Sequence, residues 1–265
     1  MIDSHLKWVK GKVKRAILNY GMLEDGDRVA VGLSGGKDSM ALLHLLYLIR
    51  REVPVNYTLH AIYINPGWPA EVEVMDEFCR ARDVPFTNKL TDIGEVVFEH
   101  HSDKNPCALC ANLRRGAINN TARDLGLNKL ALGHHLDDAI ETFFMSLIFT
   151  GQFRTFSPVT FMDRSGITLI RPLIYLTQQT VKTLVQKHGI PVVKSRCPVN
   201  GRTKREDMKE LVGSLVELFP ELKTRFLSAL QTLDPQNMWP PMVCRNMRDL
   251  HAREKDGNET PGEDS

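Results

Sequence analysis

The stretch from Val29 to Leu46, VAVGLSGGKDSMALLHLL, most restricts what this chain can fold into. It begins with an apolar, strand-like run to Leu33, crosses a polar turn at residues 34–39 and enters an apolar-rich run that predicts a helix. Two adjacent glycines in the turn can adopt positive φ and let a ligand approach the backbone. Free N–H groups at the turn and the helix start, together with the helix dipole, favour an anion. This stretch therefore predicts a phosphate site between a strand and a helix.

The turn itself, Ser34-Gly35-Gly36-Lys37-Asp38-Ser39, is not a Walker motif, because no four-residue spacer separates its glycines from the lysine. It resembles the PP-loop of the ATP pyrophosphatases, which split ATP into AMP and pyrophosphate to activate a substrate. The alternative is an ordinary strand-to-helix turn. The resemblance implies that residues 34–39 bind the phosphates of ATP.

Strands alternate with helices along the rest of the chain, which predicts an α/β fold with a doubly wound parallel sheet of about five strands. A length of 265 residues, 42% of them hydrophobic and 25% charged, suits one large globular domain. Ligands in such folds bind beyond the carboxyl ends of the strands. The predicted strands lie at residues 29–33, 57–65, 85–90, 129–133 and 167–172. The predicted helices lie at residues 40–49, 70–82, 106–125, 137–149 and 177–188, with a helical part at 211–233.

Three regions are predicted: an N-terminal basic helix at 1–27, a nucleotide-binding domain with C-terminal helices at 28–235, and a C-terminal segment at 236–265. Basic residues surround an apolar stripe in the first region, and Lys7, Lys10 and Lys14 are candidate RNA contacts. The alternative is a solvated lysine face. The last residues, from about 252, are polar and acidic, so we expect them to be disordered.

No apolar run approaches the roughly 18 residues that span a membrane, and no secretory signal precedes the first strand. A cytoplasmic location without membrane contact is therefore predicted. The net charge is +2, and residues 252–265 contribute −3 to it, so the rest of the chain carries +5, which permits an anionic partner without identifying one. The five cysteines are an odd number, which argues against a disulfide framework and for metal or catalytic roles.

Cys107 and Cys110 are three residues apart at the start of a predicted helix, so both thiols can share one face. The helix dipole and the free N–H groups there would lower thiolate pKa values. From spacing alone, half of a zinc site or a redox pair are alternatives to an iron–sulfur site. Cys79 is expected to be buried packing.

The run Gly133-His134-His135-Leu136-Asp137-Asp138 follows a predicted strand at the same rim as the phosphate turn. Asp137, helped by Asp38, is placed to hold the Mg²⁺ that accompanies ATP. The alternative is that Asp137 or Asp138 merely caps the helix. The loop at 150–158 interleaves Phe153, Arg154 and Phe156, which suits stacking on an unpaired base, or equally a hydrophobic anchor.

These motifs, with the later Arg171-Pro172-Leu173 and a single downstream cysteine, occur in the order seen in one family. From about Lys7 to Leu233 the chain resembles the tRNA 2-thiocytidine synthetases, which share the adenine nucleotide α-hydrolase-like fold. The resemblance implies ATP, Mg²⁺ and a 4Fe–4S cluster, with tRNA and a sulfur donor (a persulfide carrier or sulfide) as partners. A homodimer is left open.

The resemblance also implies residue roles. A pyrimidine carbonyl oxygen attacks the α-phosphorus of ATP, and sulfur delivered through the cluster then displaces AMP. The catalytic residues would be Asp38, Asp137, Arg114, Cys107, Cys110 and Cys197, with the three cysteines as cluster ligands. Asp38 and Asp137 would bind Mg²⁺, and ATP would contact residues 34–39, Gly133 and Asp137. The RNA contacts would be Lys7, Lys10, Lys14, Arg115 and Arg154.

Some features depart from this family. The downstream cysteine stands alone in Arg196-Cys197-Pro198, where better-known bacterial members have a second C-x-x-C. Three other readings stay open: a 2-thiouridine-forming relative, although this chain lacks cysteines for its extra zinc fingers; a cluster-free ligase of the lysidine synthetase type; and a non-catalytic nucleotide sensor. Cytidine in the anticodon loop is the favoured target.

Overall fold

The computed structural model describes residues 3–99, 106–193 and 204–232. Contacts divide the chain into two compact units, Met1–Thr224 and Arg225–Ser265, and of the second only residues 225–232 are described. Cys197 and Cys244 lie outside the described residues, as does the tail predicted to be disordered. The three predicted region boundaries stay predictions.

Six strands form one sheet with the order β3-β2-β1-β4-β6-β5. All neighbours are parallel except β5, which runs antiparallel to β6 at one edge. The prediction of a doubly wound, mostly parallel sheet is confirmed, with a sixth, antiparallel strand added to the predicted five. The strands are β1 (Asp27–Leu33), β2 (Tyr57–Asn65), β3 (Phe86–Leu90), β4 (Lys129–Ala131), β5 (Val159–Met162) and β6 (Ile167–Ile170).

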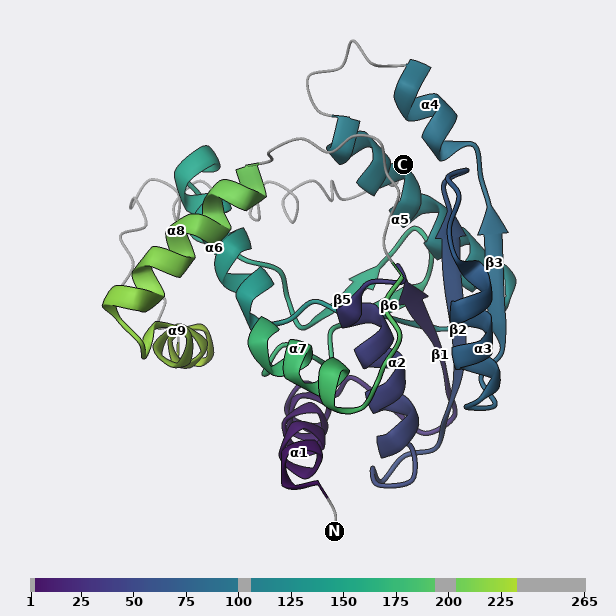
Figure 1. Ribbon diagram of the computed structural model, residues 1–265, viewed down its shortest axis with the longest axis horizontal. Coiled ribbons are helices and arrows are strands. Elements are labelled where there is room, and N and C mark those ends of the chain that lie inside the picture. The colour runs from purple at the N-terminus through teal and green to yellow at the C-terminus, as the bar shows by residue number, and fades with distance from the viewer. Residues whose placement is uncertain (1–2, 100–105, 194–203, 233–265) are drawn as a thin grey trace, which may run out of the picture. The chain divides into compact units, whose positions relative to one another are not determined.

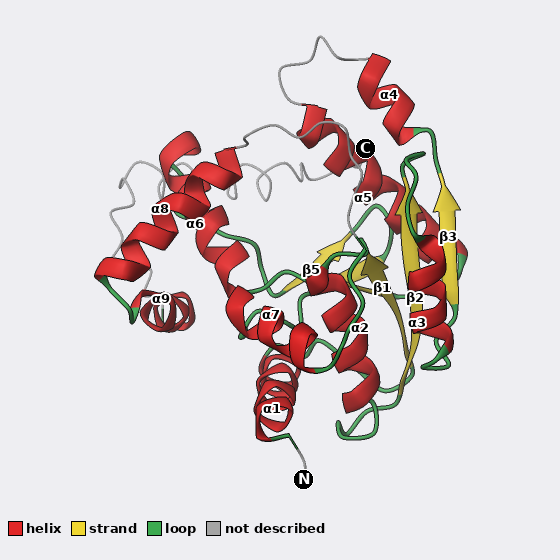
Figure 2. Ribbon diagram, in the orientation of Figure 1, coloured by secondary structure: helices red, strands yellow, loops and turns green. Residues whose placement is uncertain are grey.

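Helices cover both faces of this sheet (Figures 1 and 2). The helices are α1 (Ser4–Asn19), α2 (Lys37–Ile49), α3 (Val72–Arg80), α4 (Ile93–Glu99), α5 (Pro106–Asp124), α6 (Leu136–Thr150), α7 (Gln178–Lys187), α8 (Lys204–Leu218) and α9 (Leu222–Gln231). Helix α4 was not predicted.

The strand order explains why the faces are covered as they are. Right-handed crossovers put α2 and α3 on one face, and the return from β3 to β4 puts α4 and α5 on the other. Helix α2 packs on β1, α7 and α1, and is buried along most of its length, as its apolar sequence predicts. On the opposite face, a core of apolar side chains from β1, β2, β4 and β6 packs against α4 and α5.

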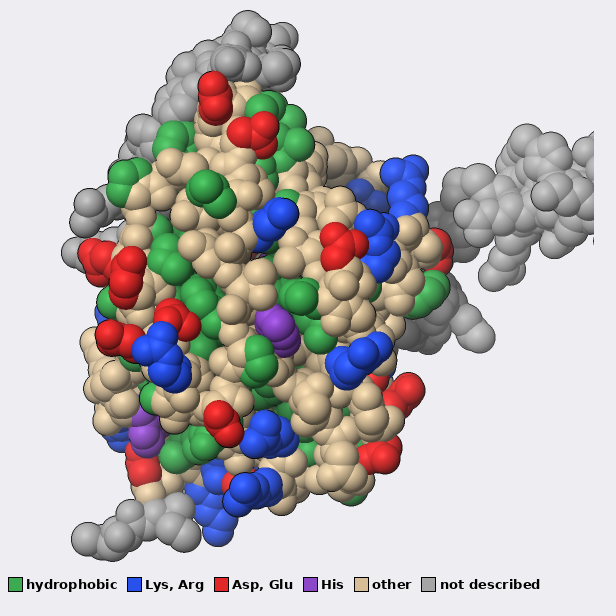
Figure 3. Space-filling model, turned by 90° about the vertical axis from the view of Figure 1, so that its right-hand side faces the viewer, with side chains coloured by type: hydrophobic (Ala, Val, Ile, Leu, Met, Phe, Trp, Pro, Cys, Tyr) green, Lys and Arg blue, Asp and Glu red, His purple; other side chains and the backbone are tan. Residues whose placement is uncertain are grey.

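No helix among the described residues is long and apolar enough to cross a membrane. Figure 3 shows one face of the molecule, where acidic and basic side chains are interspersed among apolar ones. Charges of one sign are therefore not clustered on this face. The motifs, rather than the surface charge, indicate where the candidate site lies.

Candidate functional site

The predicted motifs meet where the strand order reverses. Strands β2 and β3 extend the sheet to one side of β1, whereas β4 pairs with β1 on its other side. The phosphate turn follows β1 and the His134–Asp138 segment follows β4, so both lie at the carboxyl edge beside the switch point. They touch: a Cβ built on Gly133 would lie 2.9 Å from the carbonyl carbon of Asp38.

The turn at 34–39 is a closed hydrogen-bonded loop. The hydroxyl of Ser39 donates to the Gly36 carbonyl at 3.0 Å and accepts from the backbone N–H of Ser34 at 3.1 Å. The N–H of Gly36 donates to the Ser34 hydroxyl at 3.3 Å. Gly36 is the N-cap of α2 without any side-chain cap, so the first N–H groups of that helix are available to an anion.

Gly35 has a φ of +77°, which a side chain would strain, and a second restraint acts on it. A Cβ built there would lie 2.8 Å from the Cβ of Val193, and the Val193 N–H donates to the Gly35 carbonyl at 2.9 Å. The phosphate turn is therefore bonded to the chain just before residues 194–203, the stretch that contains Cys197.

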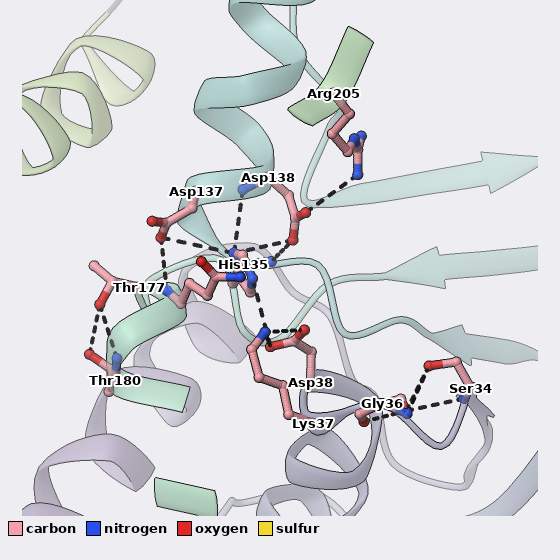
Figure 4. Close-up of polar contacts among 12 residues, drawn as sticks. Ser34, Gly36, Lys37, Asp38, His135, Asp137, Asp138, Thr177, Thr180 and Arg205 are labelled. Carbon is pink, nitrogen blue, oxygen red and sulfur yellow. Dashed lines mark hydrogen bonds and ion pairs between the residues drawn. The ribbon is translucent and has the colours of Figure 1, made fainter. Parts of the chain in front are cut away.

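Lys37 and Asp38 pair with each other at the start of α2. The Lys37 Nζ lies 2.8 and 2.7 Å from the two carboxylate oxygens of Asp38. The Nε2 of His135 lies 3.7 Å from the same carboxylate (Figure 4). Asp38 thus stands between two donors at the mouth of the phosphate turn, where a Mg²⁺ ion would compete for it.

The first turn of α6 is capped by a histidine rather than by the predicted aspartates alone. His135 is the N-cap: its Nδ1 accepts from the Asp138 N–H at 3.3 Å, and the Asp138 carboxylate accepts from the His135 N–H at 2.9 Å. Because Nδ1 accepts, the ring proton sits on Nε2, the nitrogen that faces Asp38. The capping alternative raised for Asp138 is therefore observed.

Asp137 points away from the phosphate turn. Its Oδ2 accepts from the Gln178 N–H at 2.8 Å, at the start of α7, and its Oδ1 lies 2.5 Å from the Nζ of Lys223. Asp138, in contrast, lines the cleft described below and lies 3.5 Å from the Nη1 of Arg205. The structure therefore brings Asp38 and Asp138 together, while the predicted Mg²⁺ role of Asp137 stays a prediction.

Glu141 lies one turn beyond Asp137 on α6 and is 3% exposed. Its Oε2 has no hydrogen-bond partner among the described residues, and the nearest cation is Arg205 at 4.0 Å. Burial, reinforced by the neighbouring Asp138 carboxylate, raises the pKa of Glu141 to about 7. A spacing of four residues places Glu141 beside Asp137 on one face of α6, whereas its burial depends on the tertiary structure.

A cleft of about 760 Å³ joins these elements at the carboxyl edge of the sheet. Its polar lining comes from the phosphate turn, from the start of α6 and from α5, and its floor is apolar strand surface. Arg114 and Arg115 of α5 and Arg171 after β6 line it as well. Sequence reasoning had not assigned a role to Arg171, although it had noted the Arg171-Pro172-Leu173 motif. Three guanidinium groups in one cleft favour an anionic ligand.

Cys107 and Cys110 lie near the start of the helix that lines this cleft. Cys107 lies one turn before Ala111 and two turns before Arg114, which both line the cleft. Cys107 is exposed, and Cys110 is half-buried against the core. Thiolates are the usual ligands of iron–sulfur clusters, so this pair fits two positions of such a site. Within residues 3–99, 106–193 and 204–232 no group of three metal-binding side chains is formed, and Cys197 lies outside them.

The predicted RNA contacts lie in three places. On α1, Lys10 and Lys14 both pair with Glu52, Lys14 at 2.9 Å, whereas Lys7 is exposed. Arg154 is exposed in the loop after α6. Their role in RNA binding stays a prediction, as does that of Arg115 in the cleft.

A PP-loop-type turn at the switch point of a doubly wound sheet defines a nucleotide-binding α/β protein. Residues 8–212 match the family described as the PP-loop domain. A solved structure supports the same fold: the U34-tRNA thiolase NcsA from Methanococcus maripaludis with its 4Fe–4S cluster. It aligns with a TM-score of 0.68 and 25% identity, over 87% of this chain and 80% of that one.

Sequence relatives identify the family to which the chain belongs within this class of nucleotide-binding proteins. The tRNA-cytidine(32) 2-sulfurtransferase from Syntrophotalea carbinolica is 36% identical over 89% of this chain and 93% of its own length. The one from Geotalea daltonii is 38% identical over 89% of this chain and 95% of its own. The chain belongs to this family of tRNA sulfurtransferases, and the resemblance inferred from its motifs is confirmed.

Proposed function

We propose that this chain uses ATP to replace the C2 oxygen of a cytidine in tRNA by sulfur, and that the target is cytidine 32, as in its named relatives. Membership of the family supports the reaction. The observation that carries the proposal is the shared cleft, because the phosphate turn and the helix that begins with Cys107 and Cys110 both line or border it.

The phosphate turn would hold the pyrophosphate part of ATP. Its free N–H groups, with the hydroxyls of Ser34 and Ser39, are donors rather than nucleophiles. Asp38, and by prediction Asp137, would hold Mg²⁺, while Arg114 would neutralise phosphate charge. The pyrimidine carbonyl oxygen then attacks the α-phosphorus, and pyrophosphate leaves.

The second half of the reaction exchanges the activated oxygen for sulfur. Oxygen is a poor leaving group until it carries AMP, so adenylation precedes displacement. The chain's own contribution is to position the base and the nucleotide and to compensate charge, not to transfer protons.

Cys107, Cys110 and Cys197 would hold a 4Fe–4S cluster, a group present in the aligned U34-tRNA thiolase. When bound with three thiolates, such a cluster supplies one iron with an open coordination position for the sulfur to be transferred. The chain's contribution is that α5 carries two of these thiols on the helix that lines the nucleotide cleft.

The partners that follow from this reaction are tRNA and a sulfur donor, either a persulfide carrier or sulfide. A cytoplasmic location belongs to the proposal, since the substrate is tRNA and the odd number of cysteines argues against disulfides. Lys7, Arg115 and Arg154 are the exposed or cleft-lining basic residues that we assign to RNA.

The test is the nucleoside content of tRNA from a strain that lacks the gene and is complemented with variants. Wild-type protein and the control Cys79→Ala should restore 2-thiocytidine, because Cys79 is buried in the core away from the cleft. Cys107→Ser, Cys110→Ser and Cys197→Ser should each abolish it while ATP binding persists. Loss of 2-thiouridine instead would reassign the target base, and unchanged thionucleosides in the deletion strain would overturn the proposal.

A further inference from the structure

Arg171, which follows β6, is fixed on several sides. Its Nη1 donates to the Ser157 carbonyl and, at 3.3 Å, to the Thr160 hydroxyl. Its guanidinium carbon lies 4.8 Å from the centre of the Phe156 ring, a cation–π distance. Burial and the charge of Arg115 lower the pKa of Arg171 to about 10, so it stays protonated at neutral pH. The Nε–H donor therefore has a direction set by the fold.

That donor determines the state of His134. The Arg171 Nε–H donates to the His134 Nδ1 at 3.3 Å. A guanidinium group can only donate, so Nδ1 carries no proton and the imidazole proton lies on Nε2. Burial, and next the Arg171 charge, lower the pKa of His134 to about 4, against the opposing pull of Asp138. His134 is thus neutral, with a defined tautomer.

The Nε2–H of His134 is available to a ligand. No described residue is bonded to it, and His134 is partly exposed where it lines the cleft. His134 lines the cleft, and its ring stacks at 5.2 Å and a tilt of 39° on Phe156. Phe156 therefore holds both the arginine and the histidine in place, the anchor role that the sequence left open for its loop.

The place of His134 indicates which acceptor it meets. Its neighbour Gly133 packs against the backbone of Asp38 in the phosphate turn. The same cleft is lined by Arg114 and Arg115. A neutral donor beside the turn and among guanidinium groups suits an anionic oxygen better than an uncharged base edge.

We propose that Arg171 is a positioning residue that holds His134 as its Nε2–H tautomer, so that His134 donates a hydrogen bond to a phosphate oxygen of the nucleotide bound at the PP-loop. The proposal rests on the proposed function only in taking that nucleotide to be ATP. It assigns a joint task to two motifs, Arg171-Pro172-Leu173 and the aromatic loop after α6.

The tautomer is tested by NMR of the full chain labelled with ¹⁵N-histidine, with the His134 signals identified by their loss in His134→Gln. We expect the wild-type ring to show protonated Nε2 and bare Nδ1 down to about pH 5, well below the ordinary histidine pKa of about 6.5. In Arg171→Met the tautomers should mix and the ring should titrate near its ordinary pKa. Arg164→Met, which removes an equal charge from an exposed turn, is the control and should leave the spectrum unchanged.

Nucleotide contact is tested by calorimetric titration with a non-hydrolysable ATP analogue and Mg²⁺. His134→Leu should weaken binding about five- to tenfold, whereas His134→Gln, which retains an N–H at similar reach, should stay within about threefold. Arg171→Met should weaken binding although it leaves His134 in place. Equal affinity for His134→Leu and wild type would overturn the proposal, and so would a loss confined to tRNA binding, since the donor would then face the base. A chain that binds the analogue as described but makes no 2-thiocytidine would refute the proposed function and leave this proposal intact.

Discussion

Asp137→Ala should destabilise the fold, because the buried carboxylate is bonded both to the start of α7 and to Lys223. In the structure it is about nine-tenths buried, accepts from the Gln178 N–H at 2.8 Å and pairs with Lys223 at 2.5 Å. A hydrogen bond to a charged group contributes about 1.5–3 kcal/mol to stability, and removing one partner of a buried pair leaves the other uncompensated. Lys223 keeps partial access to water, which moderates its share, so we expect a loss of about 3 kcal/mol.

For a domain of this size, each kcal/mol lowers the melting temperature by about 2–4 °C, so Asp137→Ala should melt roughly 6–12 °C below wild type. Thermal unfolding followed by circular dichroism measures this shift. Asp163→Ala, in the exposed turn between β5 and β6, is the matched control and should melt like wild type. Lys223→Met and the double variant complete a cycle whose coupling energy should be at least about 1 kcal/mol.

The reasoning would be refuted by an Asp137→Ala protein that melts like wild type. If that protein also lost Mg²⁺-dependent ATP binding, the sequence prediction of Asp137 as a Mg²⁺ ligand would hold, and its bonds to Gln178 and Lys223 would not be its main role. A variant that is destabilised yet still binds Mg²⁺ and ATP when folded would instead support Asp38 with Asp138 as the carboxylates at the phosphate turn.

Two further predictions concern the same region. Glu141 has a pKa raised from 4.5 to about 7, so its contribution to stability is full below about pH 4.5 and is lost as the pH rises through 7. Glu141→Gln should therefore increase the free energy of unfolding at pH 8 by up to about 3 kcal/mol, which raises the melting temperature, and should change the melting temperature little at pH 5. Equal shifts of the melting temperature at both pH values would contradict this. Gly133→Ala should displace the phosphate turn and weaken ATP binding at least tenfold in titrations, since its Cβ would sit 2.9 Å from Asp38. The control is Gly11→Ala on α1, where open space surrounds the glycine; this variant should bind ATP normally and be more stable by about 0.5–1 kcal/mol. A similar loss of ATP binding in both glycine variants would contradict the steric argument.

The repeating pattern of strands and helices could be predicted because each element carries its own periodicity. β2 occupies the predicted residues, and α2 begins at the phosphate turn as its sequence indicates. Strand β5 escaped prediction because it has only four residues, none of them buried, and it is held by pairing with β6 at the sheet edge. Helix α4 escaped prediction because it has only seven residues; it is stabilised by packing on α5.

Side-chain directions at the site could not be predicted, since distant residues decide them. Two adjacent aspartates open α6, and which of them faces the cleft depends on Gln178 and Lys223, 41 and 86 residues further along. Likewise the basic face of α1 is plain from sequence, but its neutralisation by Glu52 is not. Periodicity predicts the backbone, whereas charge partners come from the tertiary structure.

The hydrogen bond between the Gly35 carbonyl and the Val193 N–H has a consequence for how this enzyme can change. The Gly35 carbonyl belongs to the phosphate turn, and the Val193 N–H bonded to it belongs to a residue that precedes Cys197 by four positions in the sequence. A substitution that reshapes the turn would therefore also disturb Val193. Grafting this phosphate turn onto another protein of the same fold would therefore require a backbone N–H at the position of Val193 as well.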